Sequence, residues 1–153
     1  MRRNVFRSGL LALALLASAS VSADSPLSLS GVVSGVELCE QDVCGSAIFV
    51  AAFAGEIGKR PAVGLAIGGI VHEDLPVAPG CVDLLGGSWS IRTLRRTVGG
   101  SVIPGGDLCY VDGTKYFVRM GMNITEGGTG MATFTAVLDH GPLPPTIKGV
   151  IVQ

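Results

Sequence analysis

The stretch Met131-Ala-Thr-Phe-Thr-Ala-Val-Leu-Asp-His140 decides the fold class of this chain. Within it, the apolar residues Phe134, Ala136 and Leu138 alternate with residues that are mostly polar. Successive side chains of a β-strand point to opposite faces, so this period of two predicts a strand with one buried face.

Similar β-type segments recur along the whole chain after residue 23, separated by turns rich in glycine and proline. None of these segments shows the 3.6-residue apolar period of an amphipathic helix. Their number and spacing predict an all-β domain of about eight antiparallel strands. Besides residues 131–140, we expect strands within residues 27–36, 47–54, 62–72, 88–92, 99–109, 115–124 and 146–153.

Glycine makes up 22 of the 130 residues that follow position 23, more than double the usual share of about 7%. Many of these glycines fall inside the expected strands, where they allow bending and bulges. We therefore expect a closed or nearly closed barrel, whose interior is filled or holds one small ligand. Two stacked sheets in a β-sandwich are the alternative.

The chain contains an internal repeat, because residues 32–76 can be aligned with residues 102–144. In this alignment His72 matches His140, and each histidine precedes a Leu-Pro pair. The repeat predicts one pseudo-two-fold fold. Its two four-strand halves would span about residues 27–94 and 95–153.

Residues 1–23 have the pattern of a secretory signal peptide. Arg2, Arg3 and Arg7 precede a short apolar run, and small residues lie before the expected cleavage after Ala23. The mature chain would be a single β-domain over residues 24–153, in the periplasm or outside the cell. The apolar run is too short to span a bilayer as a helix, and we expect no transmembrane segment in the mature chain.

All four cysteines lie in the mature chain, and an even number in an exported protein favours disulfide bonds. We expect Cys39–Cys44 to close a tight loop and Cys81–Cys109 to tie the two copies together. The rival pairing is Cys39–Cys109, between aligned positions. The spacing of the cysteines fits no zinc-finger pattern.

Removing the leader leaves 8 basic and 12 acidic residues and a net charge of −4. A mildly acidic surface argues against nucleic acid, whose phosphates require a basic face. The sequence contains no nucleophile elbow, zinc-protease motif, P-loop or dinucleotide fingerprint. We therefore expect no cofactor, assign no catalytic residue and favour a non-enzymatic function.

Two sets of residues are candidate binding sites. His72 and His140 would bind a metal ion if the pseudo-symmetry brought their imidazoles together, and Glu73 and Asp74 would add oxygen ligands. The structural alternative is that each histidine ends a strand and hydrogen-bonds the following turn.

The second candidate set is the basic cluster of Trp89, Arg92, Arg95 and Arg96. Arginine forks bind anions and an indole stacks on sugars or bases, so the cluster would suit an anionic ligand or a glycan. On a continuous strand, Arg92 and Arg96 would share one face, and Trp89 and Arg95 the other. The alternative is a solvated loop with Trp89 in the core.

The acidic segment of residues 37–45, which contains Cys39 and Cys44, reads as a loop or the end of a hairpin. Glu37, Glu40 and Asp42 would offer oxygen ligands to calcium, although the segment lacks the glycine of an EF-hand. A surface loop without a metal is the alternative.

The residues from Ile124 to Gly130, followed by Phe134, resemble a segment of the dirigent and allene oxide cyclase-like barrels. The resemblance covers about ten residues and implies a barrel. It carries no catalytic residue onto this chain.

Three hypotheses for function follow. The leading one is an exported β-domain that binds a small apolar ligand or a protein partner, because residues 47–54 and 62–70 would line the interior with small apolar side chains. The second is a structural or adhesive surface component. The third is a metal-assisted enzyme centred on His72 and His140.

Overall fold

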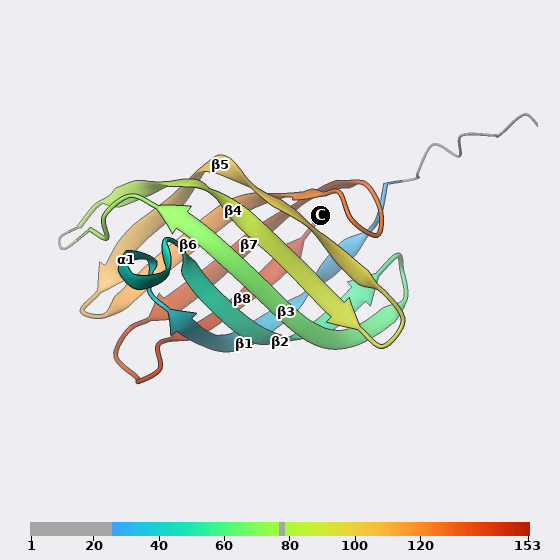
Figure 1. The fold of residues 1–153 in the computed structure, drawn as a ribbon, viewed down its shortest axis with the longest axis horizontal. Helices are drawn as coiled ribbons and strands as arrows, with labels where there is room; N and C mark the ends of the chain where they lie inside the picture. The colour runs from blue at the N-terminus through green and yellow to red at the C-terminus, as the bar shows by residue number, and fades with distance from the viewer. Residues whose placement is uncertain (1–25, 77–78) are drawn as a thin grey trace, which may run out of the picture.

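The computed structural model describes residues 26–76 and 79–153 of the chain. These residues form one closed barrel of antiparallel strands in which each strand pairs with the next along the chain, and β8 pairs back to β1 (Figure 1). The elements are β1 Leu29–Cys39, α1 Gln41–Cys44, β2 Ala47–Ile57, β3 Pro61–His72, β4 Cys81–Thr93, β5 Thr97–Asp112, β6 Lys115–Ile124, β7 Gly130–Asp139 and β8 Thr146–Val152.

The predicted fold class is confirmed, and the sandwich alternative is wrong because the β1–β8 pairing leaves no free sheet edge. The order of the strands is compatible with the predicted repeat, since β1–β4 and β5–β8 meet at the turn after Thr93. The repeat itself, and the division into two halves, stay predictions. The signal peptide falls outside the described residues.

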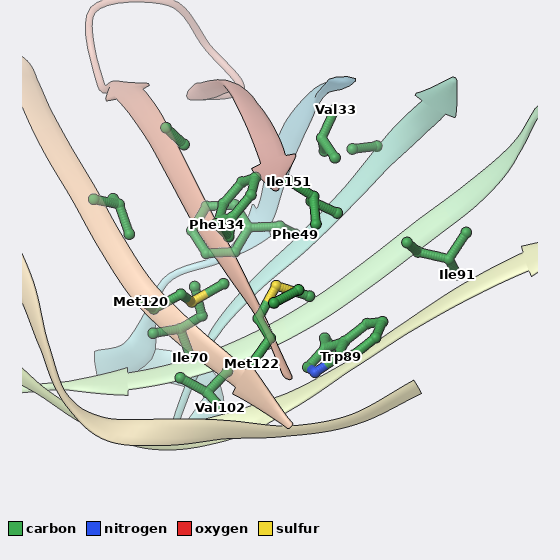
Figure 2. Close-up of a cluster of buried hydrophobic side chains, with 14 of the residues drawn as sticks. Val33, Phe49, Ile70, Trp89, Ile91, Val102, Met120, Met122, Phe134 and Ile151 are labelled. Carbon is green, nitrogen blue, oxygen red and sulfur yellow. The ribbon is translucent and has the colours of Figure 1, made fainter. Parts of the chain in front are cut away.

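Alternation along the strands separates an apolar interior from the exterior. On β7, Phe134, Ala136 and Leu138 are buried, as the sequence predicts, and Ala132 is buried with them. Figure 2 shows how the interior is filled, with side chains from opposite walls, such as Phe134 and Trp89, pointing into the same core. The buried residues form one cluster that runs through the barrel.

Several glycines allow the strong coiling that closes so small a barrel. At Gly35, a Cβ would lie 2.1 Å from the carbonyl oxygen of Val50 on β2. At Gly100, it would lie 1.9 Å from the carbonyl oxygen of Asn123 on β6. Because no side chain fits at such distances, glycine permits the close approach of neighbouring strands there.

Both predicted disulfides are present, and they exclude the rival Cys39–Cys109 pairing. Cys39–Cys44 links the end of β1 to the end of α1. Cys81 and Cys109 are directly opposite each other on β4 and β5. Two disulfides are typical of proteins in an oxidising, exported environment.

No helix in the described part of the chain is long and apolar enough to cross a membrane.

Candidate functional site

One end of the barrel contains a cavity of about 300 Å³, beneath α1. In Figure 1 this end lies on the left, and the β2–β3, β4–β5 and β6–β7 hairpins lie on the right. Side chains from seven strands line the cavity, which places it inside the barrel. Its apolar lining consists of Ala47, Phe49, Ile70, Leu75, Leu84, Leu108, Val118 and Leu138, and its polar lining of Glu37, Glu40, Gln41, Asp42, His72, Asp74 and His140.

The helix α1 is fixed over this end by one covalent bond and two hydrogen bonds. The Cys39–Cys44 disulfide holds its C-terminus to β1. The Gln41 side chain donates from Nε2 to the backbone oxygen of His72 and accepts from the backbone N–H of His72 at Oε1, both at 2.7 Å. The Gln41 side chain therefore hydrogen-bonds the backbone of β3 at the end of the strand, in the way a neighbouring strand would. These bonds hold α1 in place at the edge of the cavity.

Glu37 is the most unusual side chain at the site, because it is a carboxylate only 4% exposed. The sequence interpretation placed Glu37 in a loop, and this is wrong: β1 continues to Cys39. The inward positions of β1 run from Leu29 through Val33 to Glu37. Extending the period of two by a few residues would have identified Glu37 as an interior group.

The carboxylate of Glu37 meets the imidazole of His140, which follows β7. Oε2 and Nε2 lie 3.2 Å apart, close enough for an ion pair if the ring is protonated. Neither atom has a hydrogen-bond partner. The ring of His140 also packs against Tyr116, with 5.4 Å between ring centroids.

Burial disfavours charge on both groups. It raises the pKa of Glu37 to about 7, with a further contribution from the negative charge of Glu40. It lowers the pKa of His140, although Glu40 and Asp139 act in the opposite direction. A carboxyl with a pKa near 7 beside a largely neutral imidazole can bind, donate or accept a proton near neutral pH.

Asp139, next to His140 in sequence, takes no part in this pair. Its carboxylate accepts hydrogen bonds from Thr114 Oγ1 at 2.7 Å and from the backbone N–H of Gly141 at 2.9 Å. The Gly141 bond, followed by the Thr114 bond, lowers the pKa of Asp139. Asp139 therefore stabilises the turn after β7.

His72 and His140 line the same cavity, so the fold brings the two predicted metal ligands to one end of the barrel. Nδ1 of His72 contacts the backbone oxygen of Glu73. Within residues 26–76 and 79–153, no group of three or more His, Cys, Asp or Glu side chains is placed to hold a metal ion. The metal hypothesis gains no third protein ligand from this geometry and stays a prediction, as does the calcium hypothesis for Glu37, Glu40 and Asp42.

The basic cluster is divided by the barrel wall. Trp89 points inward and is 7% exposed, whereas Arg92, three residues later on β4, is exposed on the outside. Arg95 and Arg96 do not continue the strand, because β4 ends at Thr93 and both lie in the following turn. The predicted assignment of strand faces to these two arginines is therefore wrong.

Arg95 and Arg96 line an open depression of about 600 Å³ at the end of the barrel opposite α1. Arg60 from the β2–β3 turn joins them there. Nη2 of Arg96 donates to the backbone oxygen of Gly127 at 2.8 Å, so this guanidinium already has a structural partner. An anion site made of all four cluster residues is not assembled, because Trp89 lies inside the wall.

Three buried side-chain atoms in the described structure lack a hydrogen-bond partner: Glu37 Oε2, His140 Nε2 and Trp89 Nε1. The first two belong to the cavity beneath α1. Trp89 lines a smaller apolar space of about 60 Å³, deeper in the barrel. Phe49 and Ile70 border both spaces, so the cavity and the deeper space are neighbours.

Comparisons with protein-family models, with curated proteins and with solved structures find no match for the chain. The resemblance to dirigent and allene oxide cyclase-like barrels therefore rests on the short segment from Ile124 to Phe134 alone.

Proposed function

We propose that this protein is an exported, non-enzymatic barrel that binds one small ligand with an apolar body in the cavity beneath α1. The observation that carries the proposal is the cavity itself, which has an apolar floor and two buried polar atoms without hydrogen-bond partners. Ligand sites have this composition, with mainly apolar walls and a few polar groups that fix the orientation of the ligand. A volume of about 300 Å³ lies at the lower end of the usual range and suits a small molecule.

The disulfides and the leader-like residues 1–23 support export of the protein to the periplasm or the outside of the cell. We assign no catalytic step to the cavity.

The first test is native mass spectrometry of the mature protein purified from the periplasm. We expect an additional mass that disappears when the protein is denatured, or binding of added 1-octanol at one site. A clean mass without ligand, together with no binding of 1-octanol, octanoate or octylamine, would rule out the proposal.

A pair of matched variants locates the site. Ala47 is buried at the cavity, whereas Ala52 on the same strand is exposed on the outside. Ala47→Leu should fill part of the cavity and weaken binding of 1-octanol, and Ala52→Leu should leave binding unchanged. Equal binding by both variants would place the ligand elsewhere.

A second candidate function, self-association into a structural component, is favoured by the outer face of β8, β1, β2 and β3. Register places Val150 beside Val32, Val32 beside Ala54 and Ala54 beside Val63, so this apolar face crosses four strands. Large contiguous apolar patches mark interaction sites. The exposed large apolar residues of this face are Val32, Val63, Leu65, Ile67, Val150 and Val152.

A second copy of the chain is the occupant that this candidate requires. Sedimentation equilibrium should then show concentration-dependent dimers or larger species in the native protein, and Leu65→Lys should shift it to the monomer. Ser101→Lys, at an exposed position of β5 outside this apolar face, is the control. A native protein that is monomeric at all concentrations would exclude this candidate and leave the ligand proposal unaffected.

A further inference from the structure

We propose that the cavity beneath α1 selects ligands that carry an ammonium group on an apolar chain, with Glu37 and His140 holding the ammonium. This inference rests on the proposed function, because it names the chemical class of the ligand for the same cavity. It is carried by the two unpartnered polar atoms, the charge of the rim and the apolar floor.

The buried pair provides two acceptors at a spacing that one ammonium group can bridge. Glu37 Oε2 and His140 Nε2 lie 3.2 Å apart, and neither has a hydrogen-bond partner. An ammonium has three N–H donors, so it can donate to the carboxylate and to the neutral imidazole at once. A hydroxyl has a single donor, so it can donate to only one of them, and it accepts from His140 only when the imidazole carries its proton on Nε2. A ligand carboxylate would be repelled by Glu37.

The charge of the rim favours the same ligand class. Glu40, Asp42 and Asp74 line the cavity, and no lysine or arginine is among its lining residues. The arginines at the opposite end of the barrel, such as Arg60, are separated from it by the length of the strands. A cleft lined by one sign of charge concentrates ligands of the opposite sign.

The floor of the cavity determines the rest of the ligand. Below the Glu37–His140 pair the lining is apolar, with Leu108, Val118 and Leu138 on the far strands. If the ligand carried a polar group at each end, the inner polar group would lie beside these apolar side chains without a hydrogen-bond partner. The cavity therefore suits an amphipathic amine whose apolar chain points toward the centre of the barrel.

Binding should depend on pH through the groups that face the ammonium. These are Glu37 and, around it, Glu40, Asp42, His72, Asp74 and His140. Because the pKa of Glu37 is about 7, this carboxylate is fully charged only above neutral pH. We expect affinity for the amine to fall as pH drops below 7, by up to about tenfold per unit. Protonation of His140 would act in the same direction.

The experiment compares octylamine, 1-octanol and octanoate by isothermal titration calorimetry with the disulfide-bonded mature protein at pH 8. All three share one apolar chain and differ only in the polar group. We expect octylamine to bind about tenfold to a hundredfold more tightly than 1-octanol, the gain of one charge-assisted hydrogen bond. Octanoate should bind most weakly.

Two isosteric variants make the test specific. Glu37→Gln should remove the preference for octylamine over 1-octanol while retaining affinity for 1-octanol. The control Glu56→Gln, at the end of β2 far from the cavity, should retain the preference. If Glu37→Gln does not fold, the pH dependence of octylamine binding to the native protein tests whether Glu37 holds the ammonium.

The outcomes separate the two proposals. If 1-octanol or octanoate binds as tightly as octylamine, the amine inference is wrong and the binding function stands. If none of the three binds, both fail. An affinity for octylamine that does not change between pH 6 and pH 8 would also overturn the role of Glu37.

Discussion

The carboxylate of Glu37 and the imidazole of His140 lie 3.2 Å apart on the inner wall of the barrel, although they come from β1 and the end of β7. β8 lies between these two strands in the sheet. The pair is therefore a product of barrel closure, which places β1 and β7 on either side of β8. Its burial gives the interior a titratable group in an otherwise apolar core.

Glu37→Gln should change how stability depends on pH. The folded-state pKa of Glu37 is raised from 4.5 to about 7. The stability contribution of its protonated form is therefore fully present below pH 4.5 and is lost as pH rises through 7. Relative to Glu37→Gln, the native protein should lose up to about 3 kcal/mol of unfolding free energy over this range.

Urea denaturation at pH 4.5 and pH 8 measures this difference, with Glu56→Gln as the control. His140 contributes with the opposite sign, because its pKa is lowered by burial and its contribution is lost as pH falls below 6.5. Parallel profiles for the native protein and Glu37→Gln would contradict the prediction.

Gly68→Ala should stabilise the protein, whereas Gly64→Ala on the same strand should destabilise it. A Cβ at Gly68 has no heavy atom closer than the backbone oxygen of Ser88 at 4.0 Å, and it would enter the deeper apolar space. A Cβ at Gly64 would lie 2.3 Å from the backbone oxygen of Arg92. We expect a gain of about 0.4–1 kcal/mol at position 68 from reduced freedom of the unfolded chain.

Thermal or urea unfolding of the two variants provides the measurement, and each serves as the control for the other. A loss of stability in Gly68→Ala would show that the deeper space is narrower than described.

Gln41→Ala should loosen α1 at the rim of the cavity. The side chain of Gln41 makes two hydrogen bonds to the backbone of His72, and each is worth about 1 kcal/mol. Hydrogen exchange at the amide of His72 should accelerate in Gln41→Ala, because its acceptor is removed. Gln41→Glu keeps this acceptor and should protect the amide better. Unchanged exchange in Gln41→Ala would mean that α1 is held by its disulfide alone.

The two disulfides should differ in their effect on stability. Cys81–Cys109 spans 28 positions and Cys39–Cys44 spans 5. Since the entropic effect of a cross-link grows with loop length, we expect a loss of about 3–4 kcal/mol in Cys81→Ser/Cys109→Ser and about 2 kcal/mol in Cys39→Ser/Cys44→Ser.

Denaturation midpoints of the two double variants compare these losses directly. The second double variant should in addition weaken ligand binding, because it releases the end of α1 from β1. A larger stability loss from the short loop than from the long one would contradict the entropic account.

The strands could be predicted from local sequence. The alternation of apolar and polar residues depends only on which face of its own strand each residue occupies. The clean pattern around Phe134 predicted β7 almost to the residue, and the favoured pairing of the cysteines is the one that the structure contains. The strand prediction failed where an inward-facing position of a strand carries a polar residue. From sequence alone Glu37 reads as part of a loop or hairpin end, because an acidic residue near a cysteine resembles a surface turn. In the structure it continues the inward-facing positions of β1.

The sequence by itself determined the β class, the approximate number of strands and the inward face of β7, and it favoured the disulfide pairing that the structure contains. Only the tertiary structure decided that the sheet closes, that Trp89 and Arg92 lie on opposite sides of the wall, and that Glu37 meets His140 beneath α1. The physical reason is the range of the interactions. Alternation is set by neighbours along one strand, whereas the site depends on side chains that become neighbours only when β8 pairs with β1 and water is excluded from the interior.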